Sequence, residues 1–320
     1  MTTVGFLVFD GMTMLDFAGP AEVLGRATNY ELVLFSPRGG TVTAANGLPL
    51  AGTSIPTAED AALLDTVIIT GADDLPDRPK DHDLLGLLDA AATLCNGPRR
   101  VASVCTGSFI LAELGLLDGR RATTHWRNAR EMARRYPRVR VDTDTLHVHD
   151  GRFVTSAGIS AGIDLALSLV EEDLGAESTR DIAREMVVFM HRPGGQSQFA
   201  GAPNTPAAEN PILREVLARV QADPSGPHTV ATMASDASVS SRHLGRLFRE
   251  ELGVTPARWL EQFRMSSAQQ FILEGQTVTA AARNSGFGSD ESLRRAFDRH
   301  LRTTPSDYRA RFSSTFRRGD

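Results

Sequence analysis

The chain has 320 residues, 41% of them hydrophobic and 23% charged, which is a globular composition at a length that predicts two domains. No apolar run is long enough to cross a bilayer, and no basic N-terminal region precedes an apolar stretch, so neither a membrane protein nor a secreted protein is expected. Two cysteines are too few for a disulfide framework and fit the reducing cytoplasm, where we expect the protein to act.

The net charge of −5 averages two parts of opposite sign. Residues 1–209 carry 18 basic and 27 acidic side chains, a net charge of −9, whereas residues 210–320 carry 16 basic and 12 acidic side chains, a net charge of +4. Every basic residue of the second part is arginine, which favours planar partners such as phosphate and guanine. The asymmetry indicates a nucleic-acid-binding module joined to another domain, although GC-rich coding would also enrich arginine.

Short apolar runs alternate with helical patterns in the first 175 residues. We predict strands at 4–9, 31–35, 66–70 and 101–104, helices at 17–26, 82–94, 107–115, 127–135 and 160–173, and a hairpin of strands 138–148 and 152–156. An Asp150-Gly151 turn joins the two hairpin strands. Strands that alternate with helices need crossover connections, so the prediction is an α/β domain with a mainly parallel sheet.

The pattern changes between Arg192 and Asn210, where prolines and glycines without apolar periodicity indicate a linker. Beyond it only helical patterns occur. We therefore predict an α/β domain at 1–192, a linker at 193–210 and an all-α domain at 211–320.

The last hundred residues contain an internal repeat with an offset of 49 residues. Ser240, Leu244, Phe248, Leu252, Thr255, Pro256 and Trp259 return as Ser289, Leu293, Phe297, Leu301, Thr304, Pro305 and Tyr308. In each copy a serine N-cap opens a helix with a buried Leu and Phe, and Thr-Pro opens the next helix. A shorter helix precedes each copy, at 229–235 and 278–284. Helix, short turn and second helix form a helix-turn-helix motif, whose second helix enters the major groove.

One helix, at about 256–274, joins the two copies and spans about 28 Å. That length suits two recognition helices in successive major grooves, about 34 Å apart. Arginines gather on both recognition helices, at 242, 246 and 249 on the first and at 294, 295 and 299 on the second. A helical interaction module remains the alternative interpretation of the repeat.

The run Ser-x-Arg-x-Leu-x-Arg-x-Phe-x-x-x-x-Gly-x-Thr-Pro at 240–256, with Gly-Phe at 286–287, resembles the AraC/XylS family of transcription activators over about residues 212–312. Met233 stands where that family prefers Leu, and Arg302 replaces the glycine kept at 253. We place the DNA contacts at Ser240, Arg242, His243, Arg246, Arg249, Ser289, Glu291, Arg294 and Arg295.

Within this set, Arg242 and Arg246 are expected to read base edges, followed by Arg295, while Arg249 and Arg294 hold phosphates. Glu291 stands at the position of Arg242 in the second copy, so the two helices are expected to read different bases. A solvated salt bridge is the alternative for each single arginine.

Cys105 follows the predicted strand at 101–104 and begins a helix, which places it at a sharp strand-to-helix turn similar to a nucleophile elbow. A helix N-terminus lowers the pKa of a thiol and offers N–H groups to an anion, so we expect a reactive cysteine. The alternative is a small residue that fills a tight junction. Cys95, at a helix end, is interpreted as a packing residue.

The runs at 9–22, 103–109 and 122–126 resemble the DJ-1/PfpI family, which has a flavodoxin-like fold, over about residues 3–175. The family's reactive cysteine maps onto Cys105, and the Thr-Thr-His run of some members maps onto His125. Thr106 stands where the PfpI-type proteases carry a histidine, so the resemblance favours the isonitrile hydratase branch. It implies that Cys105 is the nucleophile and that Asp16 and Thr106 position water or substrate. Otherwise Asp16 would be an N-cap and His125 a packed side chain.

Together, in this order, the two resemblances match the GlxA family of transcriptional regulators over nearly the whole chain. The function implied is a DNA-binding regulator with double-stranded DNA and a small-molecule effector as partners. The resemblance also implies that residues 1–192 are a sensor and dimerisation domain and that the protein is a homodimer. We expect no metal and no cofactor. The alternatives are a cysteine-dependent hydratase or hydrolase with an attached DNA-binding domain, and a dimerisation scaffold with a vestigial site.

Overall fold

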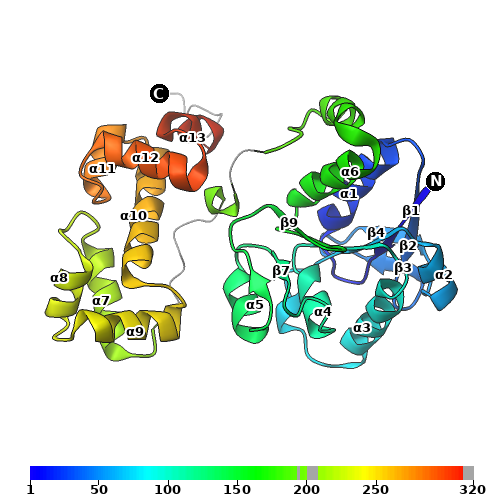
Figure 1. Ribbon diagram of the computed structural model, residues 1–320, viewed down its shortest axis with the longest axis horizontal. Helices are drawn as coiled ribbons and strands as arrows, with labels where there is room; N and C mark the ends of the chain where they lie inside the picture. Colours follow the sequence, from blue (N-terminus) through cyan, green and yellow to red (C-terminus); the bar gives the residue numbers. More distant parts are fainter. Residues whose placement is uncertain (193–194, 200–207, 313–320) are drawn as a thin grey trace. The chain divides into compact units, whose positions relative to one another are not determined.

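The computed structural model describes residues 1–192, 195–199 and 208–312, and its contacts divide the chain into two units, Met1–Gln196 and Ser197–Asp320 (Figure 1). Residues 193–194 and 200–207 of the predicted linker lie outside the described residues. The division into 1–192, 193–210 and 211–320 therefore stays a prediction. Within the described ranges, no helix has the length and apolar character that a membrane crossing requires.

Unit 1 is built on a six-stranded sheet with the order β2-β1-β5-β6-β10-β9. Its strands are β1 (Thr2–Leu7), β2 (Tyr30–Phe35), β5 (Thr66–Ile69), β6 (Arg100–Val104), β9 (His147–Asp150) and β10 (Phe153–Ser156). All neighbouring strands are parallel except β9, which is antiparallel to β10. These pairings confirm the predicted α/β class and mainly parallel sheet. As is usual for parallel strands, β5, β6 and β10 are buried along their whole length.

Helices cover both faces of this sheet. On one face α1 (Met14–Arg26) packs along α6 (Ala161–Glu185), and on the other lie α3 (His82–Cys95) and α4 (Gly107–Glu113), with α5 (Ala129–Arg135) beyond α4 (Figure 1). One apolar core runs through the sheet and both helical layers. This three-layer arrangement brings the carboxyl ends of the parallel strands to one edge, where ligand sites form in α/β folds.

Several elements differ from the prediction. The hairpin of β3 (Gly40–Thr43) and β4 (Pro49–Thr53) and the helix α2 (Ala58–Leu63) were not predicted, because most of these residues are exposed and lack an apolar run. The strand expected at 138–148 is instead two short strands, β8 (Arg140–Val141), which pairs with β7 (Arg121–Ala122), and β9. Short 3-10 turns occur at Leu75–Asp77 and Gln196–Gln198. The helix expected at 160–173 continues to Glu185, past a break at Gly175 with φ +82°.

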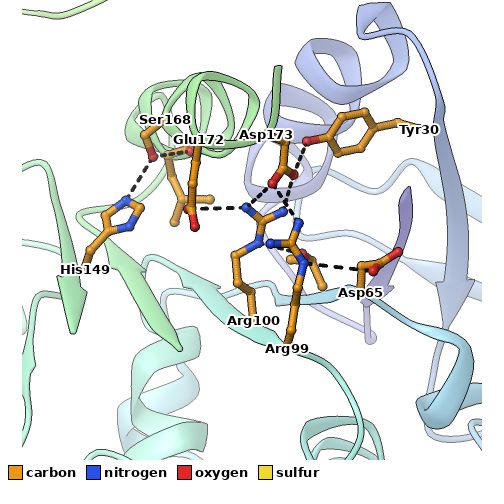
Figure 2. A network of polar contacts seen from close by, with 10 residues as sticks. Tyr30, Asp65, Arg99, Arg100, His149, Ser168, Glu172 and Asp173 are labelled. Carbon is orange, nitrogen blue, oxygen red and sulfur yellow. Dashed lines mark hydrogen bonds and ion pairs between the residues drawn. The ribbon is translucent and has the colours of Figure 1, made fainter. Parts of the chain in front are cut away.

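A polar network fastens α6 to the start of β6, at the end of the strand remote from Cys105 (Figure 2). The Arg100 guanidinium, with 5% of its side chain exposed, donates two hydrogen bonds to Asp173 and reaches Glu172 at 3.3 Å. Tyr30 and Arg99 also donate to Asp173, at 2.6 and 2.7 Å. Burial alone would raise the pKa of Asp173, but these hydrogen bonds outweigh it and bring the pKa to about 2.

Unit 2 is helical throughout its described part. Its helices are α7 (Pro211–Ala222), α8 (Val230–Asp236), α9 (Ser241–Leu252), α10 (Pro256–Leu273), α11 (Val278–Asn284), α12 (Asp290–Leu301) and α13 (Pro305–Phe312). The caps that the repeat predicts are present: Ser240 accepts from the His243 N–H at 3.2 Å, and Ser289 from the Ser292 N–H at 3.2 Å. The predicted pair of helix-turn-helix motifs is therefore confirmed as α8–α9 and α11–α12.

Candidate functional site

Cys105 lies between β6 and α4, on the turn that the sequence predicts. Its φ is +57°, a left-handed conformation that is costly for a residue with a side chain. Two neighbouring glycines make room for it: a Cβ on Gly158 would lie 2.7 Å from the Cys105 Sγ, and a Cβ on Gly71 would lie 2.9 Å from the Cys105 Cβ. Because Gly71 follows β5 and Gly158 follows β10, the carboxyl ends of three adjacent strands converge on the thiol.

Asp16 reaches this convergence from the first turn of α1 and is fully buried. Its carboxylate accepts hydrogen bonds from the Gly71 N–H at 3.0 Å and from the Ile159 N–H at 2.9 Å, and it hydrogen-bonds the Cys105 thiol. The alternative role as an N-cap is wrong, because Thr13 occupies the cap position. Asp16 instead links loops after two strands.

Burial controls the protonation of both groups. Desolvation raises the pKa of Asp16 to about 6, against the lowering effect of its two backbone hydrogen bonds. Desolvation also raises the pKa of the Cys105 thiol, and the Asp16 charge raises it further. The Thr106 N–H at the start of α4 does lower this pKa, as the sequence predicts, but burial outweighs it, so the net lowering that we expected does not occur. With 1% of its surface exposed, Cys105 is a neutral, buried thiol at neutral pH.

Thr106 is held by the backbone. Its hydroxyl donates to the Ala72 carbonyl at 2.6 Å and accepts from the Ala72 N–H at 2.9 Å. The Cys105 carbonyl accepts from Thr124 and from Ser108, at 3.0 and 3.1 Å. The Thr106 hydroxyl thus has its one donor in use and one acceptor lone pair left, so it can accept a hydrogen bond from a ligand but cannot donate one without breaking its bond to Ala72.

His125 lies near this cluster but, among the described residues, no hydrogen bond joins it to Cys105 or Asp16. Its Nδ1 accepts from the Arg127 N–H at 3.4 Å, and its ring lies 5.4 Å from that of Trp126. Burial and the Arg127 charge lower its pKa. Asp73 was missed in the sequence: it is exposed, and its charge acts on Cys105, Asp16 and His125. Its position three residues after the end of the predicted strand at 66–70 was the available signal.

Two residues close to the unit boundary bind the segments that surround Cys105. The Arg192 guanidinium forms a bidentate pair with the buried Asp164 and donates to Ser160 at 3.1 Å, directly after the Ile159 that bonds Asp16. The Gln196 amide is buried and donates to Thr123 and to the Thr124 carbonyl, each at 3.0 Å. The end of unit 1 is thus connected to both sides of the cysteine turn.

On α9 the predicted DNA-contacting side chains lie at the surface. Ser240, Arg242, Arg246 and Arg249 are exposed and His243 is half-buried, while Leu244, Leu247 and Phe248 are buried. Arg246 approaches Glu250 at 3.8 Å, with 62% of the arginine side chain exposed. Because exposed pairs of this kind contribute little stability, Arg246 can exchange its partner for a ligand.

On α12 the pattern of exposure is the same, but the charges differ. Ser289, Glu291, Arg294 and Arg295 are exposed, and Glu291 approaches Arg295 at 3.9 Å. Arg299 and His300 both contact Glu261 of α10, the histidine at 3.0 Å. Part of the positive charge of the second motif is therefore balanced within the unit.

The fold and these two surfaces define a class of protein in which an α/β domain with an elbow cysteine precedes tandem helix-turn-helix motifs. The DJ-1/PfpI family profile matches residues 2–172, and a helix-turn-helix domain profile matches residues 233–311. The chain belongs to the DJ-1/PfpI family, in the form in which this domain precedes an AraC-type helix-turn-helix domain.

Two relatives that match nearly the whole chain support this assignment. The chain is 29% identical to the HTH-type transcriptional regulator GbdR of Pseudomonas aeruginosa, over 96% of this chain and 84% of the relative. It is 27% identical to the HTH-type transcriptional regulator GlxA of Rhizobium meliloti, over 97% of this chain and 96% of the relative.

Two further similarities concern mainly unit 1. The chain is 33% identical to isonitrile hydratase of Pseudomonas putida, over 69% of this chain and 90% of the relative. A crystal structure of a ThiJ/PfpI family protein from Pseudomonas syringae matches with a TM-score of 0.52 at 24% identity, over 68% of this chain and 86% of the other. The structural match supports the fold alone.

Proposed function

We propose that the protein is a transcription regulator that binds double-stranded DNA with its two helix-turn-helix motifs. The observation that carries the proposal is the pair of capped helices α9 and α12, each with one buried apolar face and an opposite face of exposed arginines. A recognition helix needs this arrangement, because its outward side chains must reach base edges while its inner face holds it in the motif. The regulators GbdR and GlxA, which match nearly the whole chain, support the same function.

Within the interface, Arg242 and Arg246 are assigned to base edges, with Arg295 as the next candidate. Arg249 and Arg294 are assigned to phosphates, and Glu291 to a cytosine amino group. Ser240, His243 and Ser289 complete the set, at and near the helix N-termini, where N–H groups face phosphates. The net charge of residues 210–320 is only +4, so nonspecific binding is expected to be weak and strongly dependent on salt.

The proposal includes a small-molecule effector that acts on unit 1 at Asp16, Cys105, Thr106 and His125. A buried carboxyl with a raised pKa beside a strained cysteine is the kind of cluster found at functional sites. Because these side chains are buried, the effector must favour an opened state of the cluster. The contacts of Arg192 and Gln196 give such opening a route to the end of unit 1.

A homodimer in the cytoplasm, which we expect from the sequence, is also part of the proposal. Sedimentation of the full chain tests the dimer directly. The chain mass is 34.5 kDa, and we expect a species of twice that mass. A single species with the mass of one chain would contradict the dimer.

A cysteine-dependent hydratase is the second candidate, which the 33% identity to isonitrile hydratase favours. This reaction would add one water to an isonitrile and yield the formamide. The raised pKa of Cys105 argues against a ready nucleophile. Turnover of an alkyl isonitrile by the full chain, lost in Cys105→Ser, would establish the enzyme, and absence of turnover would exclude this substrate class.

Selection from a random duplex library with the full chain tests the DNA-binding function. We expect enrichment of a defined sequence at physiological salt. The chain with both Arg242→Ala and Arg246→Ala should enrich nothing, while Arg180→Ala, an exposed arginine of unit 1, serves as the control. If the unaltered chain enriches no sequence, the proposed function is wrong.

A further inference from the structure

The two helix-turn-helix motifs have separate apolar cores that share only α10. Trp259 and Leu260 of α10 belong to the core of α7–α9, whereas Met265, Ala268 and Ile272 belong to the core of α11–α13. Because the cores are separate, the only apolar link between α9 and α12 in these cores runs through α10. A contact that bridges the two motifs directly can fix their relative orientation further.

Arg264 of α10 lies at such a contact. Its Nη2 donates to the His228 carbonyl at 3.1 Å and more weakly to the Gly226 carbonyl at 3.4 Å, both in the loop that precedes α8. Its Nε is buried and has no hydrogen-bond partner, and no carboxylate among the described residues pairs with the guanidinium. Burial accordingly lowers the pKa of Arg264. An arginine that donates only to backbone carbonyls depends on the backbone conformation of that loop and not on an opposite charge.

The turn of the second motif meets the same guanidinium. A Cβ on Gly286 would lie 2.8 Å from the Arg264 Nε and 2.6 Å from the Pro224 carbonyl oxygen, and the φ of Gly286 is +79°. Only glycine fits a place where space and backbone conformation both exclude a side chain. The entry loop of the first motif, Arg264 and the turn of the second motif therefore touch at one point.

From this junction we propose that Arg264 is a positioning residue that fixes the orientation of α9 relative to α12, and so the spacing between the two half-sites that the protein accepts on DNA. The inference rests on the proposed function and deepens it. Two recognition helices on one DNA face can both bind only if their separation matches the helical repeat, about 34 Å. A change at the junction alters this separation without altering any side chain that reads a base.

The test compares spacing preferences in full-length protein. The half-sites come from the library selection with the unaltered chain, and duplexes are then made in which the spacer is shortened or lengthened by one and two base pairs. Arg264→Met removes the guanidinium, Arg264→Lys is the conservative variant, and Arg258→Met makes the same change at an exposed position of α10.

We expect Arg264→Met to lose about tenfold in affinity for the selected spacing and to bind the altered spacings nearly as well, while its affinity for a single half-site is unchanged. Arg264→Lys should recover part of the preference, and Arg258→Met should keep the full preference. Gly286→Ala, which crowds the junction from the second motif, should also reduce the spacing preference. If Arg264→Met does not fold, Gly286→Ala tests whether the junction sets the spacing.

Two results would overturn the inference. In the first, Arg264→Met has unaltered helical content and keeps both its affinity and its spacing preference. In the second, Arg264→Met loses affinity equally on every spacer and on single half-sites, which would make Arg264 a phosphate contact. Failure of the unaltered chain to enrich any sequence would instead contradict the proposed function.

Discussion

At the scale of single residues, Asp16 shows how burial reverses an expectation based on local sequence. An aspartate in the first helical turn is favoured in its charged form by the helix dipole. Here the carboxyl is fully buried beside a thiol, and desolvation outweighs its two backbone hydrogen bonds. Between pH 3.8 and about 6, the native state therefore holds a proton that the unfolded chain releases.

This difference predicts a pH-dependent stability for unit 1. Between the ordinary pKa of 3.8 and the native value of about 6, the native state binds more protons, so the free energy of unfolding falls as pH rises. The loss from this group should reach about 3 kcal/mol by pH 7. Asp16→Asn should lack it. Urea unfolding followed by Trp126 emission in a Trp259→Phe background measures unit 1, and Glu59→Gln is the exposed control. Parallel pH profiles for Asp16→Asn and the parent would refute the assignment.

Arg302 is a second residue where local geometry carries a cost. It ends α12 with φ +49°, whereas the equivalent position at the end of α9 is Gly253 with φ +67°. Arg302→Gly should stabilise unit 2 by about 0.5–1 kcal/mol, because relief of the left-handed strain exceeds the entropy that glycine adds to the unfolded chain. Gly253→Arg should destabilise it by about 1 kcal/mol. Calorimetry of the full chain separates the transition of this unit, and destabilisation by Arg302→Gly would be the contrary result.

At the scale of elements, two aspartates of α6 fix this helix to its surroundings. Asp173 binds Arg100 at the start of β6, and Asp164 binds Arg192 close to the end of unit 1. Asp173 has 10% of its side chain exposed and neutralises the buried Arg100, while its neighbour Glu172 is 51% exposed (Figure 2). The two carboxylates on one helix therefore make a matched pair for mutation.

Asp173→Ala should cost about 3–5 kcal/mol of unit 1 stability, because it leaves a buried guanidinium without its main partner. Glu172→Ala should cost about 1 kcal/mol or less. Urea unfolding followed by Trp126 emission compares them, and the double variant Arg100→Met with Asp173→Leu should restore much of the loss. Equal effects of the two alanine variants would show that the network is not centred on Asp173.

The sequence predicts best the elements that begin at residues with a recognisable local role, such as helix caps. Serine caps and Thr-Pro steps repeat at an offset of 49 residues, and they predict the residues at which α9, α10 and α12 begin. The hairpin β3–β4 has no such signal, because its strands are exposed and rich in glycine. For the candidate site, the turn at Cys105 was predictable from the strand before it. The pairing of Asp16 with Gly71 and Ile159 was not, since it joins segments 55 and 143 residues apart.

At the scale of the whole molecule, the protein joins an acidic α/β unit to a helical unit whose excess charge is arginine. The end of unit 1, at Arg192 and Gln196, is bound to the segments on either side of Cys105. If an effector at Cys105 acts through these contacts, then loss of the Arg192 contact in Arg192→Leu should loosen the end of unit 1.

Limited proteolysis of the full chain measures that loosening. Cleavage close to Gln196 should become at least about tenfold faster in Arg192→Leu, because the ion pair with the buried Asp164 no longer holds the end of unit 1. Arg184→Leu, which breaks an exposed ion pair with Asp181, is the control and should not change the rate. Unchanged cleavage in Arg192→Leu would show that the Arg192 contact does not restrain the end of unit 1.

The central claim is that α9 reads a DNA sequence, and a fluorescence anisotropy titration of the full chain on the selected duplex and on a scrambled duplex tests it most directly. Arg246→Ala should weaken binding to the selected duplex by roughly 1–3 kcal/mol and leave the weak binding to the scrambled duplex nearly unchanged. Arg180→Ala should change neither. Equal binding of both duplexes by the unaltered chain, or an equal loss on both in Arg246→Ala, would contradict sequence-specific recognition by this helix.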